Sequence, residues 1–162
     1  MKTLQKKDAM EQFIEDMQAV LVRSYAQQRS EMIKRRMTNK VAKGYSMARP
    51  PLGYSQTDVK GLYKPNALGE AIGSILKAFT EDKISLDESL RYLKVLMSAH
   101  EKRTPNRERV VKLMLNPYYA GFVKWNGKTY EGLHEPIITE EIHNSVVRKI
   151  PFWAFPSKSV GN

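Results

Sequence analysis

The sequence contains no cysteine among its 162 residues. This absence excludes disulfide bonds and every metal site that depends on thiolate ligands. Long apolar runs are absent as well: no segment approaches the roughly 18 apolar residues of a membrane-spanning helix. Residues 1–10 also lack the apolar centre of a signal peptide. We therefore expect a soluble, cytoplasmic protein.

Histidine is scarce, with only His100, His134 and His143 present. Because these residues are far apart and no cysteine accompanies them, they make a poor metal-binding set, and we expect no metal and no other cofactor. The sequence has no phosphate-binding glycine loop and no nucleophile elbow. His134 beside Glu135 is compatible with an acid–base pair, but its place between an extended segment and Pro136 favours a hydrogen-bonded structural role.

Acidic residues are nearly missing from residues 29–54, where seven basic side chains face one acid, Glu31, and the local charge is +6. The whole chain has a formal net charge of +10 and a pI near 9.7. This asymmetry favours a polyanionic partner, either nucleic acid or an anionic membrane surface. The seven basic residues are Arg29, Lys34, Arg35, Arg36, Lys40, Lys43 and Arg49.

Residues 1–43 contain neither glycine nor proline, so one helix can continue until Gly44 stops it with a left-handed conformation. Apolar side chains recur every three or four positions in its first half, and we expect them to pack on a helix of another domain or of a second copy. In the second half Lys34, Arg35 and Arg36 have few acids nearby, and a phosphate backbone would offset their repulsion. A coiled-coil spacer with a solvated charged face is the alternative for that half. The apolar residues are Met10, Phe13, Ile14, Met17, Val20, Leu21 and Tyr25.

An extended segment follows, because Pro50 and Pro51, which come directly after Arg49, hold the backbone extended and remove two amide donors. Residues 52–54 and 61–63 predict two short extended pieces around a turn.

Three helices are predicted next, and their start signals are visible in the sequence. Asn66 starts the first, and Ser85 starts the second in a capping box with Glu88. Thr104 as N-cap and Pro105 as first helical residue start the third. The helices are expected over residues 67–80, from residue 86 to the polar stretch 98–103, and over residues 106–115.

The third helix is short and basic, and it turns Val110, Val111, Met114 and Leu115 inward. Three consecutive helices of this size have the pattern of a helix-turn-helix domain. Its solvent-facing residues would be Arg103, Asn106, Arg107, Arg109 and Lys112.

A β-hairpin is predicted after the third helix, with Asn126 and Gly127 as the favoured two-residue turn between residues 122–125 and 128–130. A hairpin in this position is a wing, whose Lys124 and Lys128 near its tip suit a phosphate contact. The strands can also simply cover the edge of the core. Thr139 caps a final helix, with acids in its first turn. The expected fold is mainly α (α+β): a long N-terminal helix (1–44), a helix-turn-helix or winged-helix-like domain with a small β-hairpin (45–150), and a C-terminal linker or tail (151–162).

Several segments in this order resemble the recombinase domain of large serine recombinases, enzymes that integrate and excise mobile elements. The resemblance covers about Gln12 to Arg148. Its segments are ARPPLGY, GLYKPNALGEAIGSIL, KISLDESLRYL, RVVKLMLNPYYAGFVKWNG and LHEPIIT.

The resemblance implies that the long helix links catalytic and DNA-binding parts, takes part in self-association and crosses the minor groove. Arg49 would be a minor-groove arginine, and the helix after Pro105 would lie by the major groove. The expected partner is double-stranded DNA at an attachment site, bound sequence-specifically. The candidate DNA-binding residues are Lys34, Arg35, Arg36, Lys40, Lys43, Arg49, Arg103, Asn106, Arg107, Arg109, Lys112 and Lys124.

The resemblance also implies a catalytic serine domain before residue 1 and a zinc ribbon after the chain, neither of which the sequence contains. Its serines, such as Ser24, Ser30, Ser46 and Ser55, lack the surrounding arginines of the family's nucleophile. We therefore expect a recombinase fragment that binds DNA and is inactive alone. The main alternative is a free-standing winged-helix regulator that dimerises through its long helix. Membrane-surface binding is disfavoured because apolar and basic residues occupy successive halves of that helix rather than opposite faces.

Overall fold

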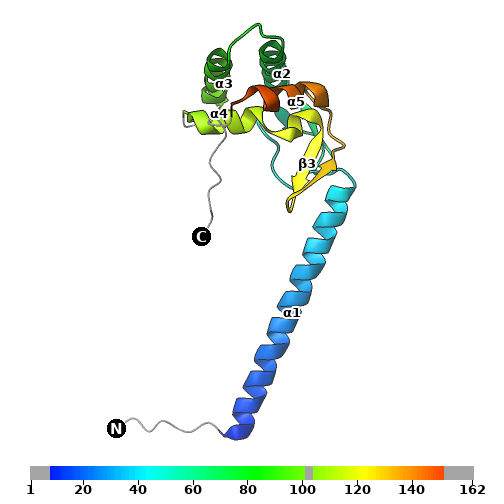
Figure 1. Cartoon of the computed structure of the whole chain (residues 1–162). Coiled ribbons are helices and arrows are strands. Elements are labelled where there is room, and N and C mark those ends of the chain that lie inside the picture. Colours follow the sequence, from blue (N-terminus) through cyan, green and yellow to red (C-terminus); the bar gives the residue numbers. More distant parts are fainter. Residues whose placement is uncertain (1–7, 101–103, 152–162) are drawn as a thin grey trace, which may run out of the picture. The chain divides into compact units, whose positions relative to one another are not determined.

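The computed structural model describes residues 8–100 and 104–151. The chain divides into two units, Met1–Asn39 and Lys40–Asn162, and each is described by itself below. The expected mainly α fold with a long N-terminal helix and small antiparallel hairpins is confirmed (Figure 1). The elements are α1 (Ala9–Ala42), β1 (Tyr54–Gln56), β2 (Tyr63–Pro65), α2 (Ala67–Thr80), α3 (Leu86–His100), α4 (Arg107–Met114), the 3-10 helix η1 (Pro117–Ala120), β3 (Phe122–Trp125), β4 (Lys128–Glu131) and α5 (Glu140–Lys149).

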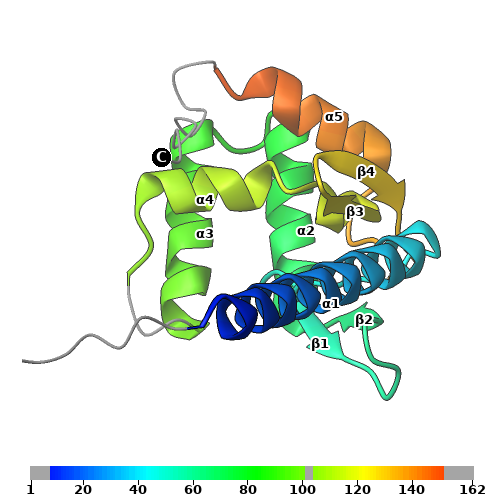
Figure 2. The ribbon, with the colours of Figure 1, turned by 90° about the horizontal axis from the view of Figure 1, so that it is seen from below.

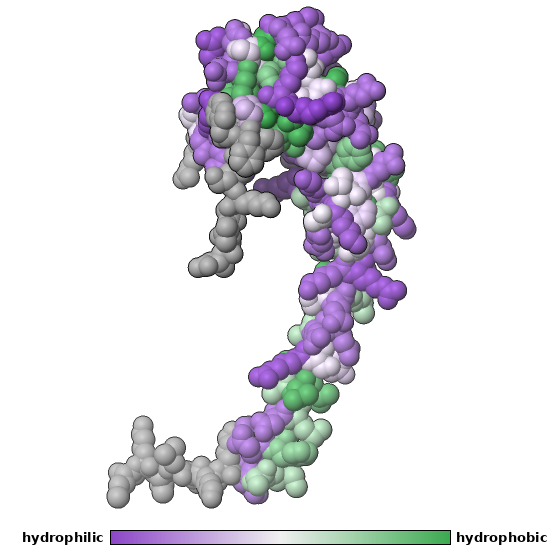
Figure 3. Space-filling model, in the orientation of Figure 1, coloured by the Kyte–Doolittle hydropathy of each residue, from purple (hydrophilic) through white to green (hydrophobic). Residues whose placement is uncertain are grey.

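The first unit consists of α1 without its last turn. Because no glycine or proline interrupts it, the helix is continuous, and its 34 residues span about 50 Å at ~1.5 Å per residue. Its apolar side chains are exposed, Phe13 at 59% and Tyr25 at 71%, since a single helix has no second element to cover them. Figure 3 shows apolar residues gathered on the N-terminal half of α1 and hydrophilic residues on its C-terminal half.

The last turn of α1 belongs to the second unit, where Val41 is completely buried. The helix ends as predicted at Gly44, whose φ is +84°. The Tyr45 N–H donates to the Lys40 carbonyl at 3.2 Å and the Gly44 N–H to the Val41 carbonyl at 2.8 Å, which is a Schellman cap. The Gly44 carbonyl then accepts from the Leu133 N–H at 2.9 Å, so the helix end is joined to the segment after β4.

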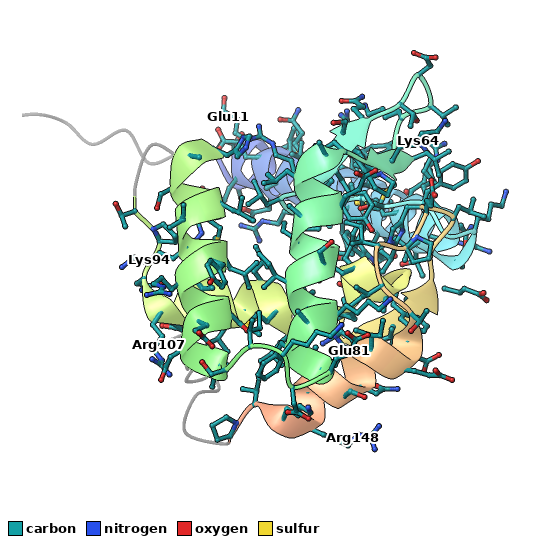
Figure 4. All side chains as sticks on the ribbon, turned by 90° about the horizontal axis from the view of Figure 1, so that it is seen from above. Glu11, Lys64, Glu81, Lys94, Arg107 and Arg148 are labelled. Atoms are coloured by element: carbon teal, nitrogen blue, oxygen red, sulfur yellow. The ribbon has the colours of Figure 1, made fainter. Side chains whose placement is uncertain are left out.

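The core of the second unit lies between the α2–α3 pair and the two helices that cover one side of it. In Figure 2, α4 and α5 lie in front of α2 and α3, and in Figure 4, seen from the other side, α2 and α3 lie in front. Apolar residues at three- and four-residue spacing place a buried stripe on each helix. The side chains with no exposed surface include Ile72, Leu76, Leu93, Val111, Met114, Tyr119 and Val146.

Helix caps account for where α2 and α3 begin. The Asn66 side chain accepts from the Gly69 N–H at 3.1 Å, as predicted. The predicted capping box is also present: Glu88 accepts from the Ser85 N–H at 2.8 Å, and the Glu88 N–H donates to the Ser85 hydroxyl at 3.3 Å. These contacts satisfy backbone donors that have no partner inside the helix.

The predicted N-cap of the third helix is wrong by two residues. Asn106, not Thr104, is the N-cap of α4, and its Oδ1 accepts from the Arg109 N–H at 3.0 Å. Asparagine is a stronger N-cap than threonine, and the cap at Asn106 puts Pro105 just outside the helix, where it is buried.

The second hairpin lies at the predicted residues, whereas the strands of the first begin two residues later than the predicted segments 52–54 and 61–63. Tyr54 pairs with Pro65 in the first, and Trp125 pairs with Lys128 in the second. The turn residues of the second hairpin, Asn126 and Gly127, have φ of 47° and 76°, as a two-residue turn of type I′ requires. Thr139 caps α5 as predicted, with its Oγ1 accepting from the Ile142 N–H at 3.3 Å.

A cluster of aromatic rings holds the extended segment that contains Leu52 and Tyr54 against the rest of the second unit. His134, 4% exposed, has Nε2 at 2.7 Å from the Tyr118 carbonyl and stacks on the Tyr118 ring at 3.7 Å. The Tyr54 hydroxyl donates to the Glu135 carbonyl at 3.0 Å, and the Tyr119 hydroxyl donates to the Leu52 carbonyl at 2.7 Å. The predicted structural role of His134 is confirmed, and burial lowers its pKa, which keeps the ring neutral.

Candidate nucleic-acid interface

The segment 46–54, called the strap here, crosses the second unit between two hollows. The hairpin hollow, about 270 Å³, is lined by strap residues including Ser46 and Arg49 and by β3 residues including Lys124 and Trp125. The α4 hollow, about 540 Å³, is lined by the other end of the strap together with Arg109 of α4. The strap therefore adjoins both the wing and the third helix.

Glycines allow the strap to lie directly on the start of α2. The Gly53 φ is +96°, and a Cβ on Gly53 would lie 2.8 Å from the Gly69 Cα. The Gly53 carbonyl accepts from the Asn66 N–H at 3.0 Å. Because only glycine combines this φ with such a close approach, any side chain at residue 53 would displace the strap and with it Arg49.

Three of the predicted cations border the hollows. Arg49 and Lys124, 75 residues apart in sequence, line the same hairpin hollow, and Arg109 lines the α4 hollow. All three side chains are exposed. Lys40 and Lys43, at the end of α1, are exposed as well. The second unit therefore presents positive charge on the strap, the wing and α4.

Two further cations of α4 have carboxylate partners. Arg107 NH1 lies 3.3 Å from Asp87, beside α3 (Figure 4), and Lys112 Nζ lies 2.6 Å from Glu108. All four side chains are substantially exposed. Exposed pairs of this kind contribute little, typically 0–1 kcal/mol, so a phosphate can compete for either cation.

The remaining candidates have different surroundings. Lys34, Arg35 and Arg36 belong to the first unit and are exposed; as consecutive residues at about 100° each they spread over roughly 200° of the helix, so they cannot all face one groove. Asn106 has its Oδ1 engaged in the cap of α4. Arg103 lies outside the described residues.

Sequence reasoning missed two polar groups of the hairpin hollow, the Tyr118 hydroxyl and the Trp125 indole nitrogen. Both side chains line this hollow, and neither donor has a hydrogen-bond acceptor among the described residues. The only sequence signal was indirect: both residues fall within the segment RVVKLMLNPYYAGFVKWNG that carries the family resemblance.

Neither a metal site nor a membrane-spanning helix is found among the described residues. In the part of the chain that the structure describes, no three histidine, aspartate or glutamate side chains are grouped so as to hold a metal ion. None of the described helices combines the length and the apolar character needed to cross a bilayer. The hollows beside the strap thus stand out by their cations rather than by metal ligands.

Comparison with known proteins assigns the family. A family model described as "Recombinase" matches residues 56–150, which is more than half of the chain. The chain belongs to the Recombinase family. This confirms the resemblance to the recombinase domain of large serine recombinases. No curated protein matches the sequence closely enough to be counted as a relative.

Two solved structures share the fold of this recombinase domain. One is a crystal structure of an LSR–DNA complex, with 21% identity and a TM-score of 0.52 over 73% of this chain. The other, from work on the sequence requirements of the Listeria innocua prophage attP site, has 24% identity and a TM-score of 0.51, also over 73% of this chain. The match spans only 36% and 50% of those two chains.

Proposed function

We propose that this recombinase domain binds double-stranded DNA sequence-specifically, at an attachment site of a mobile element. The observation that carries the proposal is the strap: Arg49 lies on it, and the hollows on its two sides are bordered by Lys124 of the wing and Arg109 of α4. Three exposed cations on three adjoining elements suit a polyanion with regularly spaced phosphates. The matched LSR structure is a complex with DNA, which supports the same partner here.

The proposed interface assigns different roles to different elements. Helix α4 would lie by the major groove, with Arg107 and Arg109 as candidates for base or phosphate contacts. The family resemblance implies that Arg49 lies at the minor groove, where arginine is attracted by the negative potential. Asn106 is less suited to bidentate adenine contact than its position implied, because its Oδ1 already accepts a backbone hydrogen bond.

The long helix would serve both contact and assembly. The second half of α1 carries Lys34, Arg35 and Arg36, whose side chains are exposed, as phosphate contacts require. The exposed apolar side chains of its first half would pair with another helix in the full-length protein. In this proposal residues 1–44 remain a linking helix, 45–150 the DNA-binding domain and 151–162 a linker or tail, although the last turn of α1 packs in the second unit. The chain by itself would bind without cutting; Ser46, for example, is buried and donates to the Ala48 carbonyl at 3.1 Å.

The test is selection of sequences from a random duplex pool by the full chain, followed by affinity measurements. Enrichment of one motif is expected, and Arg107→Ala should relax preference at one or two base pairs, worth about 1–3 kcal/mol each. Lys77→Ala, an exposed cation on α2 away from both hollows, is the control and should leave the motif unchanged.

Two results would contradict these assignments. Selection without any enriched motif would limit the chain to non-specific binding. A uniform loss of affinity across all sequences in Arg107→Ala would make Arg107 a phosphate contact.

A further inference from the structure

Two residues that line the hairpin hollow, Tyr118 and Trp125, carry buried hydrogen-bond donors without an acceptor among the described residues: the Tyr118 hydroxyl and the Trp125 Nε1. Tyr118 is 7% exposed. Burial raises the pKa of Tyr118 to about 12, and the Ser46 side chain, which lies next to the phenol without the geometry of a hydrogen bond to it, lowers that pKa, so the phenol keeps its proton at neutral pH. A buried donor without an acceptor destabilises a folded protein. Two donors without acceptors therefore lie buried in the side chains that form this wall of the hollow.

The same hollow carries two cations and no acid. Arg49 enters from the strap and Lys124 from β3, and none of the residues that line the hollow is acidic. The other polar side chains there are already engaged: Asn116 Oδ1 accepts from the Tyr118 N–H at 3.1 Å, and the Ser46 hydroxyl donates to the Ala48 carbonyl at 3.1 Å. A ligand would thus meet two positive charges and two unused donors.

These groups select the chemistry of the ligand. A site made only of donors and cations needs an anionic acceptor, and a phosphodiester oxygen is one. A base edge fits less well, because bases present donors as well as acceptors and would leave both cations uncompensated. An apolar ligand would leave the two buried donors unsatisfied.

We propose that the hairpin hollow binds one backbone phosphate of the DNA, with Arg49 and Lys124 as its counter-charges and Tyr118 and Trp125 as hydrogen-bond donors. This inference rests on the proposed function, because it names the part of the duplex that one part of the interface takes. Both donor atoms are closed to solvent in the free chain, so the phosphate reaches them only after side chains at the mouth shift.

The proposal changes the role of Arg49. As a phosphate ligand Arg49 positions the domain on the duplex, whereas as a minor-groove arginine it would read A·T-rich sequence. Arg49→Ala should therefore weaken binding to all sequences about equally, without relaxing any position of the selected motif.

Tyr118→Phe is the decisive variant, because it removes only the hydroxyl. It should weaken DNA binding roughly tenfold, the loss of one hydrogen bond to a charged group, while the urea midpoint of unfolding stays equal or rises. Tyr119→Phe is the matched control: its hydroxyl already donates to the Leu52 carbonyl, so its loss should lower the urea midpoint. A merely structural Tyr118 hydroxyl would lower stability and affinity together.

A double-mutant cycle tests whether both cations hold the same phosphate. The affinity lost in the Arg49→Ala/Lys124→Ala double variant should be smaller than the product of the two single losses, because the groups share one ligand. Lys128→Ala is the control: Lys128 is on the same hairpin but does not line the hollow, and its effect should multiply with that of Arg49→Ala. Independent effects of Arg49 and Lys124 would refute the shared phosphate.

The indole N–H resonance of Trp125 separates failure of this inference from failure of the proposed function. The chain has two tryptophans, and Trp153→Phe leaves Trp125 as the only indole. A shift of its N–H signal on DNA binding supports the site, and DNA binding without a shift overturns it while the proposed function stands. If no DNA binds, the same resonance is followed while inorganic phosphate is added, with chloride at equal ionic strength as the control. A saturable shift that the Arg49→Ala/Lys124→Ala variant abolishes supports the phosphate site in the hollow. The absence of such a shift overturns the site.

Discussion

The two units of this chain use similar residue types in opposite ways. In the first unit apolar side chains of α1 are exposed, with Leu21 at 52%, whereas in the second unit those of α2, α3 and α4 are buried, with Leu93 at 0%. The reason is that a lone helix has no neighbour, while α2 and α3 have each other and two covering helices. Helical periodicity alone therefore does not reveal whether a stripe is a core or a surface waiting for a partner.

The basic side chains of the two units also differ in whether they lie beside carboxylates. Lys112 and Arg107 of α4 lie beside carboxylates, whereas Lys34, Arg35 and Arg36 form no ion pair with any residue that the structure describes. A phosphate can displace exposed carboxylates, but cations without such partners have less to give up on binding DNA. This contrast leads to the following predictions.

The largest effect is expected on the free energy of unfolding, when leucine is replaced by alanine at a buried position of the second unit and at an exposed position of the first. Leu93→Ala should lower the free energy of unfolding by about 2–5 kcal/mol because it leaves a cavity in a packed core. Leu21→Ala, at an exposed position, should change it by less than about 0.5 kcal/mol in the monomer. Urea denaturation of the full chain measures both. Equal losses would mean that α1 is covered, and a concentration-dependent loss for Leu21→Ala would show that a second copy covers it.

Removing the basic cluster of the first unit should come next. The Lys34→Ala/Arg35→Ala/Arg36→Ala variant should flatten the dependence of log affinity on log salt by about two units, at ~0.9 per lost contact, because consecutive residues cannot all reach phosphates. The measurement is DNA binding by fluorescence anisotropy between low and moderate salt. An unchanged slope would remove this helix from the DNA interface.

A smaller effect is expected at the start of α4, where the observed N-cap differs from the one predicted from the sequence. Asn106→Ala should cost about 1 kcal/mol of stability because it removes the cap of α4. Thr104→Ala, outside the cap, should be near neutral. Thermal unfolding of the two variants checks this order, and the reverse order would restore Thr104 as the cap.

The smallest effect should be a pH dependence of the second unit. Burial lowers the pKa of His134 below its ordinary value of 6.5, so the unfolded state takes up a proton first as the pH falls. Stability should be full above about pH 6.5 and decrease below it, toward the lower pKa of the folded state. His134→Gln should remove this step; a step of the same size in that variant would assign it to other groups.

Local signals in the sequence were sufficient for most of the elements. The predicted span 67–80 is α2 itself, and the Asn126–Gly127 turn lies where it was expected, because caps and turn residues act over three or four positions. Val95, which sits among the apolar residues of the second predicted helix, is 63% exposed. Leu93, Leu96 and Met97 nearby in the sequence are apolar, but no element among the described residues covers the side of α3 that carries Val95.

The candidate site was predictable in its residue types and not in its geometry. Charge alone indicated a polyanion, the hairpin pattern indicated Lys124, and the resemblance named Arg49. Their meeting at one hollow depends on the strap, which Gly53 and the Tyr119–Leu52 hydrogen bond place across the domain.

The amino-acid sequence by itself determined the helices, the turns, the excess of positive charge and the family, because each depends on residues near one another or on composition. Only the tertiary structure decided which cations share a hollow, which apolar stripe is buried and which donors are left without acceptors. Those properties depend on contacts between segments far apart in the chain, and no local pattern encodes them.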